Sequence, residues 1–405
     1  MAIPWHGPDM RYFAILLGLL LWAGPVRAQE SAACAALVSA MGGGMQARFL
    51  PSYPTSADPA LKDAAFLYDN AVAAIALTGC GRRDLGARIG DAILRALAQD
   101  RHWRDGRLRN AYLAGVVDAE PVKLPGWYDA RQDRWVEDRY QVSSDTGNLA
   151  WAMLALLALD DDAADRRYRD GAARIGRFLL RWQTSGTPGG FTVGTLGHEP
   201  APLAPPWKST EHNTDLAAAF TGLVQTDGPR WREPAAAAAR FVAAMWDEGC
   251  RCLSVGTGAD GATPNRFLAL DAQVWPLLAL PHPAARRAQI ITTVRARLAA
   301  EGGYTYGAAA RGFWSEGTAQ MALLLRLAGE EKEAAGLMRA LGAQRSTGGY
   351  YNAAAATLDT GFASDSDPKQ ARHYFRLPHL GATAWVALAE QSFNPFTRRR
   401  ALPQR

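Results

Sequence analysis

The sequence predicts an all-α protein in which six helical hairpins close into a double ring, an (α/α)6 toroid with short β-like turns in its loops. Alanine and leucine are abundant and long alternations of Val, Ile and Thr are rare, which favours helices over sheets. Two kinds of helical segment alternate along the chain, one apolar throughout and one amphipathic. An open row of hairpins would need polar capping repeats at its ends, and we find none, so we expect one closed ring.

The segments of the first kind are rich in alanine and follow a polar cluster. A helix that is apolar on every side is buried, so these segments are expected to form the inner ring. The polar clusters span 68–70, 143–148, 210–213, 270–273, 314–318 and 379–383, and the apolar runs begin at 71, 149, 216, 274, 319 and 384. In the third, Ser209 or Thr210 can cap the helix after the proline-rich loop 198–206. Such a cluster either only caps its helix or also binds a ligand.

The segments of the second kind are amphipathic and rich in arginine, as expected of an outer ring in contact with water. They span 82–100, 162–182, 230–246, 283–301 and 330–344, and an N-terminal segment near 30–49 can complete the set. In the second of them, Ile175, Phe178 and Leu179 fall at helical spacing, with arginines between them. Turns of glycine and aromatic residues, such as 302–304, then lead to the next buried helix.

The N-terminus has the features of a secretory signal. Arg11 precedes an apolar run at 13–22, and Val26-Arg27-Ala28 resembles a cleavage site with small residues. The run is shorter than the ~20 apolar residues that a membrane span needs. We therefore expect the signal to be removed, no stable membrane insertion afterwards, and a periplasmic or secreted protein.

The predicted signal covers 1–28, the ring covers 29–395 as a single domain, and 396–405 is a basic tail that we expect to be disordered. The formal net charge of +5 over 405 residues is modest and gives no reason to expect a nucleic acid partner. One closed ring of this size can act as a monomer.

The four cysteines form two groups. Export permits disulfides, and we favour a bridge between Cys34 and Cys80, because Cys250 and Cys252 are too close in sequence to bridge without strain. The latter two are expected to be free or to staple a loop. Histidines are few and scattered, and no glycine-rich phosphate loop with a lysine is present, so we expect no metal and no other cofactor.

The alternation of helices and the polar starts of the inner ones resemble the six-hairpin, (α/α)6 toroid glycosidase superfamily. This resemblance implies a glycan-binding cleft at the N-terminal ends of the inner helices, and a glycoside hydrolase or polysaccharide lyase activity. The segment from Ser315 to Met321 is also similar to the Ser-Glu-Gly segment of family 8 glycanases, which implies that Glu316 is the general acid. In that family the segment lies near the start of the chain, whereas here it lies in the fifth hairpin, so we do not assign family 8.

Glycoside hydrolysis needs two carboxyl groups that face each other across a sugar bond, one protonated and one ionised. The repeat places five acidic residues at one end of the inner ring: Asp69, Asp145, Glu211, Asp271 and Glu316. We predict that Glu211 is the general acid and Asp145 the base, that Glu316 can replace either, and that Asp69 and Asp271 bind substrate. The alternative for each is a carboxylate that only caps its helix.

Sugar rings stack on aromatic side chains, and neighbouring polar groups bind their hydroxyls. Trp207 could shield Glu211, while His212 and Asn213 orient it or bind hydroxyls. The other aromatic residues that we predict to bind substrate are Tyr68, Trp127, Tyr128, Tyr140, Trp314 and Tyr350. The loop 108–142 mixes such residues with arginines, so it could hold an acidic polysaccharide or simply face water.

These features favour an exported carbohydrate-active enzyme, a glycoside hydrolase that cleaves an oligo- or polysaccharide by Asp/Glu acid–base catalysis. A glycan-binding or envelope polysaccharide assembly factor without catalysis would need the same fold. A lyase or epimerase of uronic-acid glycans would instead use Tyr140 or His212 as base, with Asn213 or Arg139 neutralising the substrate carboxylate. A pair of carboxyl groups at the centre of the site would favour the hydrolase, and a Tyr/His/Arg cluster the lyase or epimerase.

Overall fold

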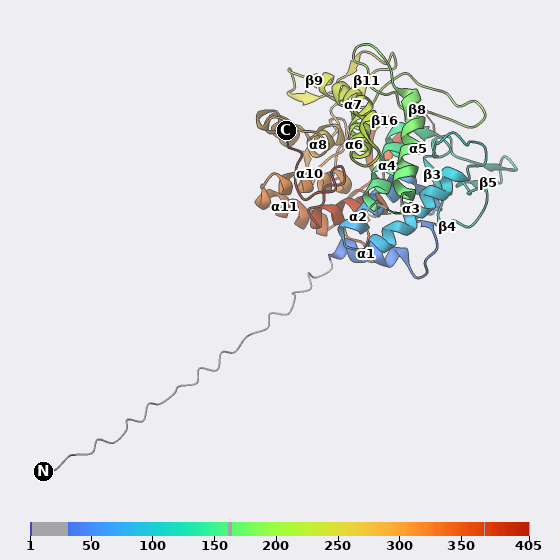
Figure 1. Cartoon of the computed structure of the whole chain (residues 1–405), viewed down its shortest axis with the longest axis horizontal. Helices are drawn as coiled ribbons and strands as arrows, with labels where there is room; N and C mark the ends of the chain where they lie inside the picture. The colour runs from blue at the N-terminus through green and yellow to red at the C-terminus, as the bar shows by residue number, and fades with distance from the viewer. Residues whose placement is uncertain (2–30, 161–163, 368, 405) are drawn as a thin grey trace. The chain divides into compact units, whose positions relative to one another are not determined.

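Two concentric rings of helices build the protein between residues 31 and 404 (Figure 1). The computed structural model describes residues 1, 31–160, 164–367 and 369–404, and the described helices all belong to one unit that starts at Ser31. The signal predicted at 1–28 lies, apart from Met1, outside the described residues.

The inner ring consists of α2 (Leu67–Gly79), α4 (Thr146–Leu159), α6 (Thr210–Asp227), α8 (Asp271–Ala279), α10 (Ser315–Leu327) and α12 (Leu380–Glu390). Each inner helix packs against the next, and α12 packs against α2, so the ring is closed. These helices are almost entirely buried, which explains why their sequences carry no polar face. The six predicted inner segments are therefore the six inner helices.

The outer ring consists of α1 (Ala32–Met41), α3 (Arg83–Ala98), α5 (Arg167–Leu179), α7 (Arg232–Ala244), α9 (Ala284–Leu298) and α11 (Glu331–Gly342). Five outer helices each pack on the inner helix that precedes them: α3, α5, α7, α9 and α11. The sixth, α1, packs on α12. The N-terminal helix thus completes the last hairpin by packing on α12. In α5, Ile175, Phe178 and Leu179 are buried and Arg177 is exposed, as the amphipathic pattern predicts.

Short antiparallel strand pairs occupy the loops, with no larger sheet among the described residues. The pairs are β1 (Arg48–Phe49) with β4 (Gly115–Val116), β2 (Ala64–Phe66) with β3 (Ala111–Leu113), β5 (Trp127–Asp129) with β6 (Arg134–Val136), β7 (Ser144–Asp145) with β8 (Gly194–Thr195), β9 (Trp246–Asp247) with β10 (Cys252–Leu253), β11 (Gly256–Thr257) with β12 (Pro264–Asn265), β13 (Ala299–Ala300) with β14 (Gly303–Tyr304), β15 (Tyr351–Asn352) with β18 (Pro378–His379), and β16 (Leu358–Ala363) with β17 (Ala371–Tyr374). Several of these strands lead directly into an inner helix, such as β7 into α4 and β18 into α12. They fix where each inner helix begins, and therefore where its first polar side chains lie.

Aromatic side chains from four inner helices, α2, α4, α8 and α12, fill the centre of the ring. Trp151, Trp275 and Trp385 have ring centroids between 5.2 and 6.0 Å apart, and Tyr68 packs edge-on against Trp151 at 5.3 Å. This cluster closes the ring below the helix starts, so the toroid has a packed core and is not a pore.

The C-terminal segment 396–404 is folded onto the ring, which corrects the expectation of a disordered tail. Phe396 is buried and packs 5.1 Å from Trp151. Arg398 donates a hydrogen bond to the carbonyl of Leu157 at 2.6 Å, and Asn394, just before the segment, donates one to Leu278 at 2.8 Å. Arg398 and Asn394 thus satisfy carbonyls at the C-terminal ends of α4 and α8, which otherwise lack intrahelical partners.

Two disulfides are present among the described residues. One joins Cys34 in α1 to Cys80 after α2, and so ties the N-terminal helix to the ring. The other joins Cys250 to Cys252, a pairing that the sequence argument disfavoured. Cys250 lies in the turn between β9 and β10, and Cys252 is the first residue of β10; their Cα atoms are 5.2 Å apart.

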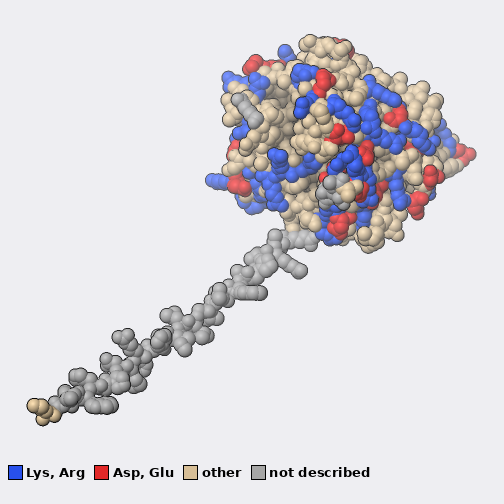
Figure 2. Space-filling model, in the orientation of Figure 1, with Lys and Arg blue, Asp and Glu red and all other residues tan. Residues whose placement is uncertain are grey.

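Within the described residues, no helix combines the length and the apolar character that a membrane crossing requires. On the face seen in Figure 2, Lys and Arg are interspersed with Asp and Glu.

Candidate active site

The polar starts of the inner helices meet at one end of the ring. Asp145 caps α4, Glu211 lies in the first turn of α6, and Asp271 is the first residue of α8. Asp69 and Glu316 lie in the first turns of α2 and α10. The charges of these groups act on one another: Asp271 raises the pKa of Glu211 and of Glu316, and Asp69 raises that of Glu316. The five predicted acidic residues therefore form one cluster.

Glu211 and Asp271 form a carboxyl pair within hydrogen-bond reach of each other. Burial raises the pKa of Glu211 well above its ordinary value, and the negative charge of Asp271 raises it further. Burial also raises the pKa of Asp271, against the opposing effects of its bond from the backbone N–H of Ala272 and of the charge on Arg372. The pair is best described as sharing one proton, with Glu211 neutral and Asp271 ionised.

Glu316 is almost fully buried and holds a chain of hydrogen bonds. The indole N–H of Trp385 donates to the hydroxyl of Tyr68 at 2.7 Å, and that hydroxyl donates to Glu316. The amide of Gln320 donates to the same carboxyl oxygen at 3.3 Å. Burial raises the pKa of Glu316 to about 7, because it outweighs the opposing effects of His379 and Tyr68. Glu316 can therefore change its protonation state near neutral pH.

Asp69 pairs with His379, the residue that caps α12. The Nε2 of His379 lies 3.3 Å from Asp69, and its Nδ1 accepts the backbone N–H of Ala382 at 3.2 Å. Burial lowers the pKa of His379, but the charges of Asp69 and Glu316 outweigh it and leave the pKa raised. A Cβ at Gly381 would lie 2.5 Å from Asp69 Oδ1 and 3.3 Å from Glu316 Oε2, so only glycine lets the two carboxyl groups approach α12 this closely.

Asp145 combines a structural role with partial access to solvent. Its side chain accepts the backbone N–H of Asn148 at 2.9 Å, so it is the N-cap of α4. Burial raises its pKa to about 6, although the bonds from Asn148 and Tyr140 and the charge of Arg372 oppose the increase. Asp145 is thus ionised above this pH and remains a candidate base.

His212 lies beside Thr146 at the start of α4 and stays neutral at neutral pH. Burial lowers its pKa to about 4, and its Nδ1 lies 3.2 Å from the hydroxyl of Thr146. A Cβ at Gly147 would meet the imidazole at 2.5 Å, so the glycine at the start of α4 makes room for this ring.

Arg372 reaches the cluster from β17, on a hairpin between α11 and α12 that is far in sequence from the starts of α4, α6 and α8. Its charge lowers the pKa values of Asp145, Glu211 and Asp271. Figure 1 shows β16 of the same hairpin in the region of α4 and α6, in agreement with these electrostatic interactions.

The structure separates the other predicted residues into two groups. Tyr140 lies near Asp145, and Trp207 is half-buried before α6. In contrast, Asn213 is fully buried, and its amide is used by the backbone of Phe191 and Ser209. Trp314 is also buried, and packs against Tyr306 and Tyr374.

Three predicted aromatic residues have no described contact with the acidic cluster. Trp127 and Tyr128 pair with Val136 and Trp135 within the β5–β6 hairpin, where Tyr128 is 58% exposed. Tyr350 is half-buried just before β15.

Sequence reasoning missed several side chains that surround the acids. His379 carried a signal, because it opens the sixth polar cluster. The residues without such a signal are Tyr53, Asp215, Tyr306, Asp365, Arg372 and Tyr374, whose charges or burial link them to the cluster.

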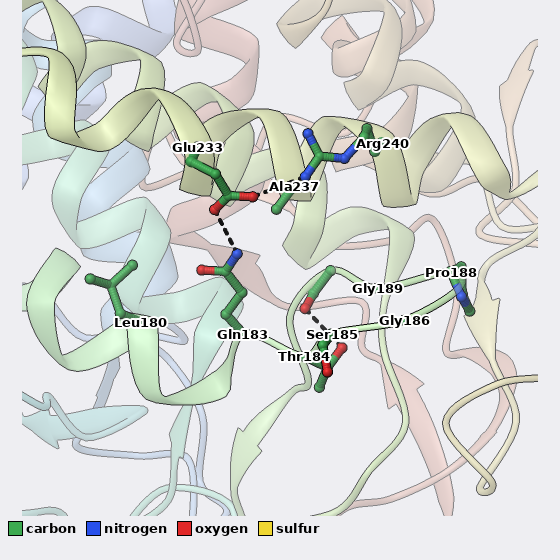
Figure 3. A pocket seen from close by; sticks show the side chains of 11 residues that line it. Leu180, Gln183, Thr184, Ser185, Gly186, Pro188, Gly189, Glu233, Ala237 and Arg240 are labelled. Atoms are coloured by element: carbon green, nitrogen blue, oxygen red, sulfur yellow. Dashed lines mark hydrogen bonds and ion pairs between the residues drawn. The ribbon is translucent and has the colours of Figure 1, made fainter.

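The described residues contain no group of three His, Cys, Asp or Glu side chains that could hold a metal ion. One surface cavity, of about 490 Å³, lies between the loop 183–190 and α7 (Figure 3). Its one acidic residue, Glu233, is bonded to Gln183 and Arg240, and no residue of the acidic cluster lines it. Volume therefore does not identify the site, whereas the convergence of acids with raised pKa values does.

No protein-family model and no curated protein matches the sequence. Solved structures do match over most of their length. A glycosidase variant in complex with glucose is 14% identical, with a TM-score of 0.59 over 89% of this chain and 95% of that one. A GH76 α-mannanase from Bacteroides thetaiotaomicron is 11% identical, with a TM-score of 0.55 over 89% and 94% of the two chains. A sugar epimerase from a ruminal bacterium is 11% identical, with a TM-score of 0.60 over 88% and 95%.

The chain has the six-hairpin toroid fold of these glycosidases. The fold predicted from the alternating helices is thereby confirmed. At these identities the similarity establishes the architecture, and the reaction has to be argued from the site.

Proposed function

We propose that this six-hairpin protein is an exported glycoside hydrolase that uses carboxyl groups at the inner helix starts for acid–base catalysis. The observation that carries the proposal is the Glu211–Asp271 pair, in which burial and the charge of Asp271 raise the pKa of Glu211 and so favour its protonated form. A general acid must hold its proton at working pH and release it when the leaving group develops negative charge. Glu211 is half-buried, so it also remains accessible to a substrate.

In the proposed reaction, Glu211 donates its proton to the glycosidic oxygen as the bond to the anomeric carbon breaks. A water molecule adds to that carbon and loses a proton to an ionised carboxylate. Asp145, with its pKa near 6, is the favoured base, and Glu316 is the alternative because its carboxyl group titrates near pH 7. Water is thus added across the bond, and Glu211 is reprotonated from solvent.

The test is a screen of the purified mature protein against neutral and acidic bacterial glycans, with the products identified by mass. A hydrolase adds water, whereas a lyase leaves an unsaturated end. We expect Glu211→Gln to lower kcat/KM by ~100-fold to 10,000-fold, the usual contribution of general acid catalysis. Glu248→Gln is the matched control, because Glu248 is 81% exposed and has a single distant ion pair. Full activity of Glu211→Gln would refute the assignment.

A second reaction, proton abstraction from a sugar carbon, is favoured by a specific cluster. Arg372 is surrounded by the phenol groups of Tyr140, Tyr306 and Tyr374 and lies near His212. The similarity to a sugar epimerase makes an epimerase or lyase the alternative. Incubation in heavy water separates these reactions: an epimerase replaces a carbon-bound proton with deuterium, a lyase loses that proton and leaves an unsaturated end, and a hydrolase keeps it. Binding of a glycan without any turnover would instead favour a non-catalytic role.

We also propose that the protein acts as a monomer outside the cytoplasm. Two disulfides and the signal-like N-terminus support export. The mass of the protein recovered from the periplasm or medium should match a chain that starts at residue 29, and a chain that keeps residues 1–28 would contradict export by this signal.

A further inference from the structure

The β16–β17 hairpin is packed firmly enough to hold Arg372 in a fixed place. Phe362 of β16 packs on Phe267 with ring centroids 4.6 Å apart. Tyr374 of β17 packs on Trp314 at 5.3 Å and on Tyr306 at 5.9 Å. Phe267 precedes α8, while Tyr306 and Trp314 precede α10. The hairpin therefore packs against the segments that lead into two inner helices.

The guanidinium of Arg372 has no described hydrogen bond or ion pair, although acidic groups surround it. Its charge acts on Asp145, Glu211, Asp271 and Asp365, yet no carboxyl oxygen of a described residue lies within ion-pair distance of it. The residue is also exposed to solvent. Because a guanidinium has five N–H donors in a planar fork, this side chain is free to bind oxygen atoms of a ligand.

The surrounding charges determine which ligand is favoured. Four carboxyl groups act on one guanidinium, and even with Glu211 protonated three of them can be ionised. An anionic ligand on Arg372 would lie among these carboxylates, and Arg139, which acts on Asp365, balances only part of their charge. An uncharged, hydroxyl-rich ligand can use the same N–H donors without this repulsion.

We propose that Arg372 anchors an uncharged sugar unit by donating hydrogen bonds to its hydroxyl or ring oxygens, and that the carboxylates around it exclude uronate-bearing glycans. This inference rests on the proposed function in that the sugar is the one presented to Glu211. It makes Arg372 a specificity-determining residue, and it speaks against an acidic polysaccharide as the preferred substrate.

The test is calorimetric binding of two probe sets to the purified protein: neutral gluco-, manno- and galacto-oligosaccharides, and oligogalacturonates of the same length. The wild type should bind at least one neutral probe, and bind it ~10-fold or more tightly than the uronate probe. Arg372→Gln should lower the affinity for the neutral probe by ~10-fold, because the hydrogen bonds from a charged donor are lost. Arg372→Lys should recover part of that loss, which a purely structural role would not predict.

Two exposed residues of the same segment provide matched controls. Arg376→Gln should leave binding unchanged, because Arg376 is exposed and has no described ion pair. Asp365→Asn tests the role of the carboxylates and should lower the ratio of the affinities for the neutral and uronate probes several-fold. Asp359→Asn is its control and should leave that ratio unchanged, because Asp359 lies on the exposed side of β16. Circular dichroism of each variant establishes that the hairpin change has not unfolded the protein.

Tighter binding of the uronate probe, no effect of Arg372→Gln, or no binding of any neutral probe would each overturn the inference. Failure of the proposed function is a separate outcome. Neutral probes that bind through Arg372 but are never cleaved would refute the hydrolase and leave the inference intact. Cleavage of uronate glycans with addition of water would support the hydrolase and refute the inference.

Discussion

Replacement of Glu316 by glutamine should stabilise the protein at alkaline pH. The carboxyl group is 3% exposed, and its pKa rises from 4.5 to about 7 on folding. The folded state therefore binds this proton more tightly than the unfolded state does. Its stabilising contribution is complete below pH 4.5 and is lost as the pH rises toward 7. At ~1.4 kcal/mol per pKa unit, the loss amounts to about 3 kcal/mol.

Glutamine removes the titration but keeps a carbonyl oxygen that can accept the hydroxyl of Tyr68. The free energy of unfolding, measured with urea between pH 4.5 and 8, should therefore fall less in Glu316→Gln than in the wild type. Comparing the two proteins at each pH cancels the titration of the other carboxyl groups to a first approximation. Equal slopes across this range would show that Glu316 is ionised normally and would refute the reasoning.

Three further predictions concern the fold and the pH dependence of activity. Phe396→Ala should lower the free energy of unfolding by ~3–5 kcal/mol, the usual cost of a buried phenylalanine, and an unchanged urea midpoint would mean that the C-terminal segment does not pack on the ring. Replacing Cys34 and Cys80 together by serine should cost about 4 kcal/mol for a bridge of sequence separation 46; a melting temperature unaffected by reduction of the wild type would contradict this. Since the pKa of Asp145 is about 6, activity should decline as the pH falls through 6, and Asp145→Asn should abolish that limb of the pH–rate profile rather than shift it.

The helical architecture was predictable because each inner helix must bury all its faces. Residues 149–159 contain no charged residue before Asp160, and the helix they form, α4, is buried along nearly its whole length. The sequence predicted the closure of the ring and the position of α1 less directly. Both depend on contacts between the two ends of the chain, in which α12 packs on α1 and α2. The tail was mispredicted since the run Arg398-Arg399-Arg400 suggests a solvated segment, whereas Phe396 and Arg398 use carbonyls and aromatic rings that only the closed ring provides.

The acidic cluster was predictable for a similar reason, because a buried helix carries its polar residues at its N-terminal end, and these ends meet at one side of the ring. Asp69, Asp145, Glu211, Asp271 and Glu316 were found this way. The pairing of Glu211 with Asp271 was not foreseen, because it depends on the contact between α6 and α8 rather than on either sequence.

Arg372 could not be found from the sequence. It comes from a loop hairpin with no inner-helix pattern, and its place depends on aromatic contacts such as Tyr374 with Trp314. The roles given to Trp127, Tyr128 and Tyr350 stay predictions. A sequence shows that a loop contains aromatic residues, but it does not show where they lie relative to the acidic cluster.

The most direct test of the account is the protonation state of Glu211 in the resting protein. Infrared difference spectra between the wild type and Glu211→Gln at pH 7 should show the carbonyl band of a neutral carboxylic acid that disappears in the variant. The band should persist to higher pH in the wild type than in Asp271→Asn, because the negative charge of Asp271 helps to retain the proton. A spectrum with only an ionised carboxylate at Glu211, titrating near 4.5 like an exposed glutamate, would contradict the proposal that this ring holds a general acid.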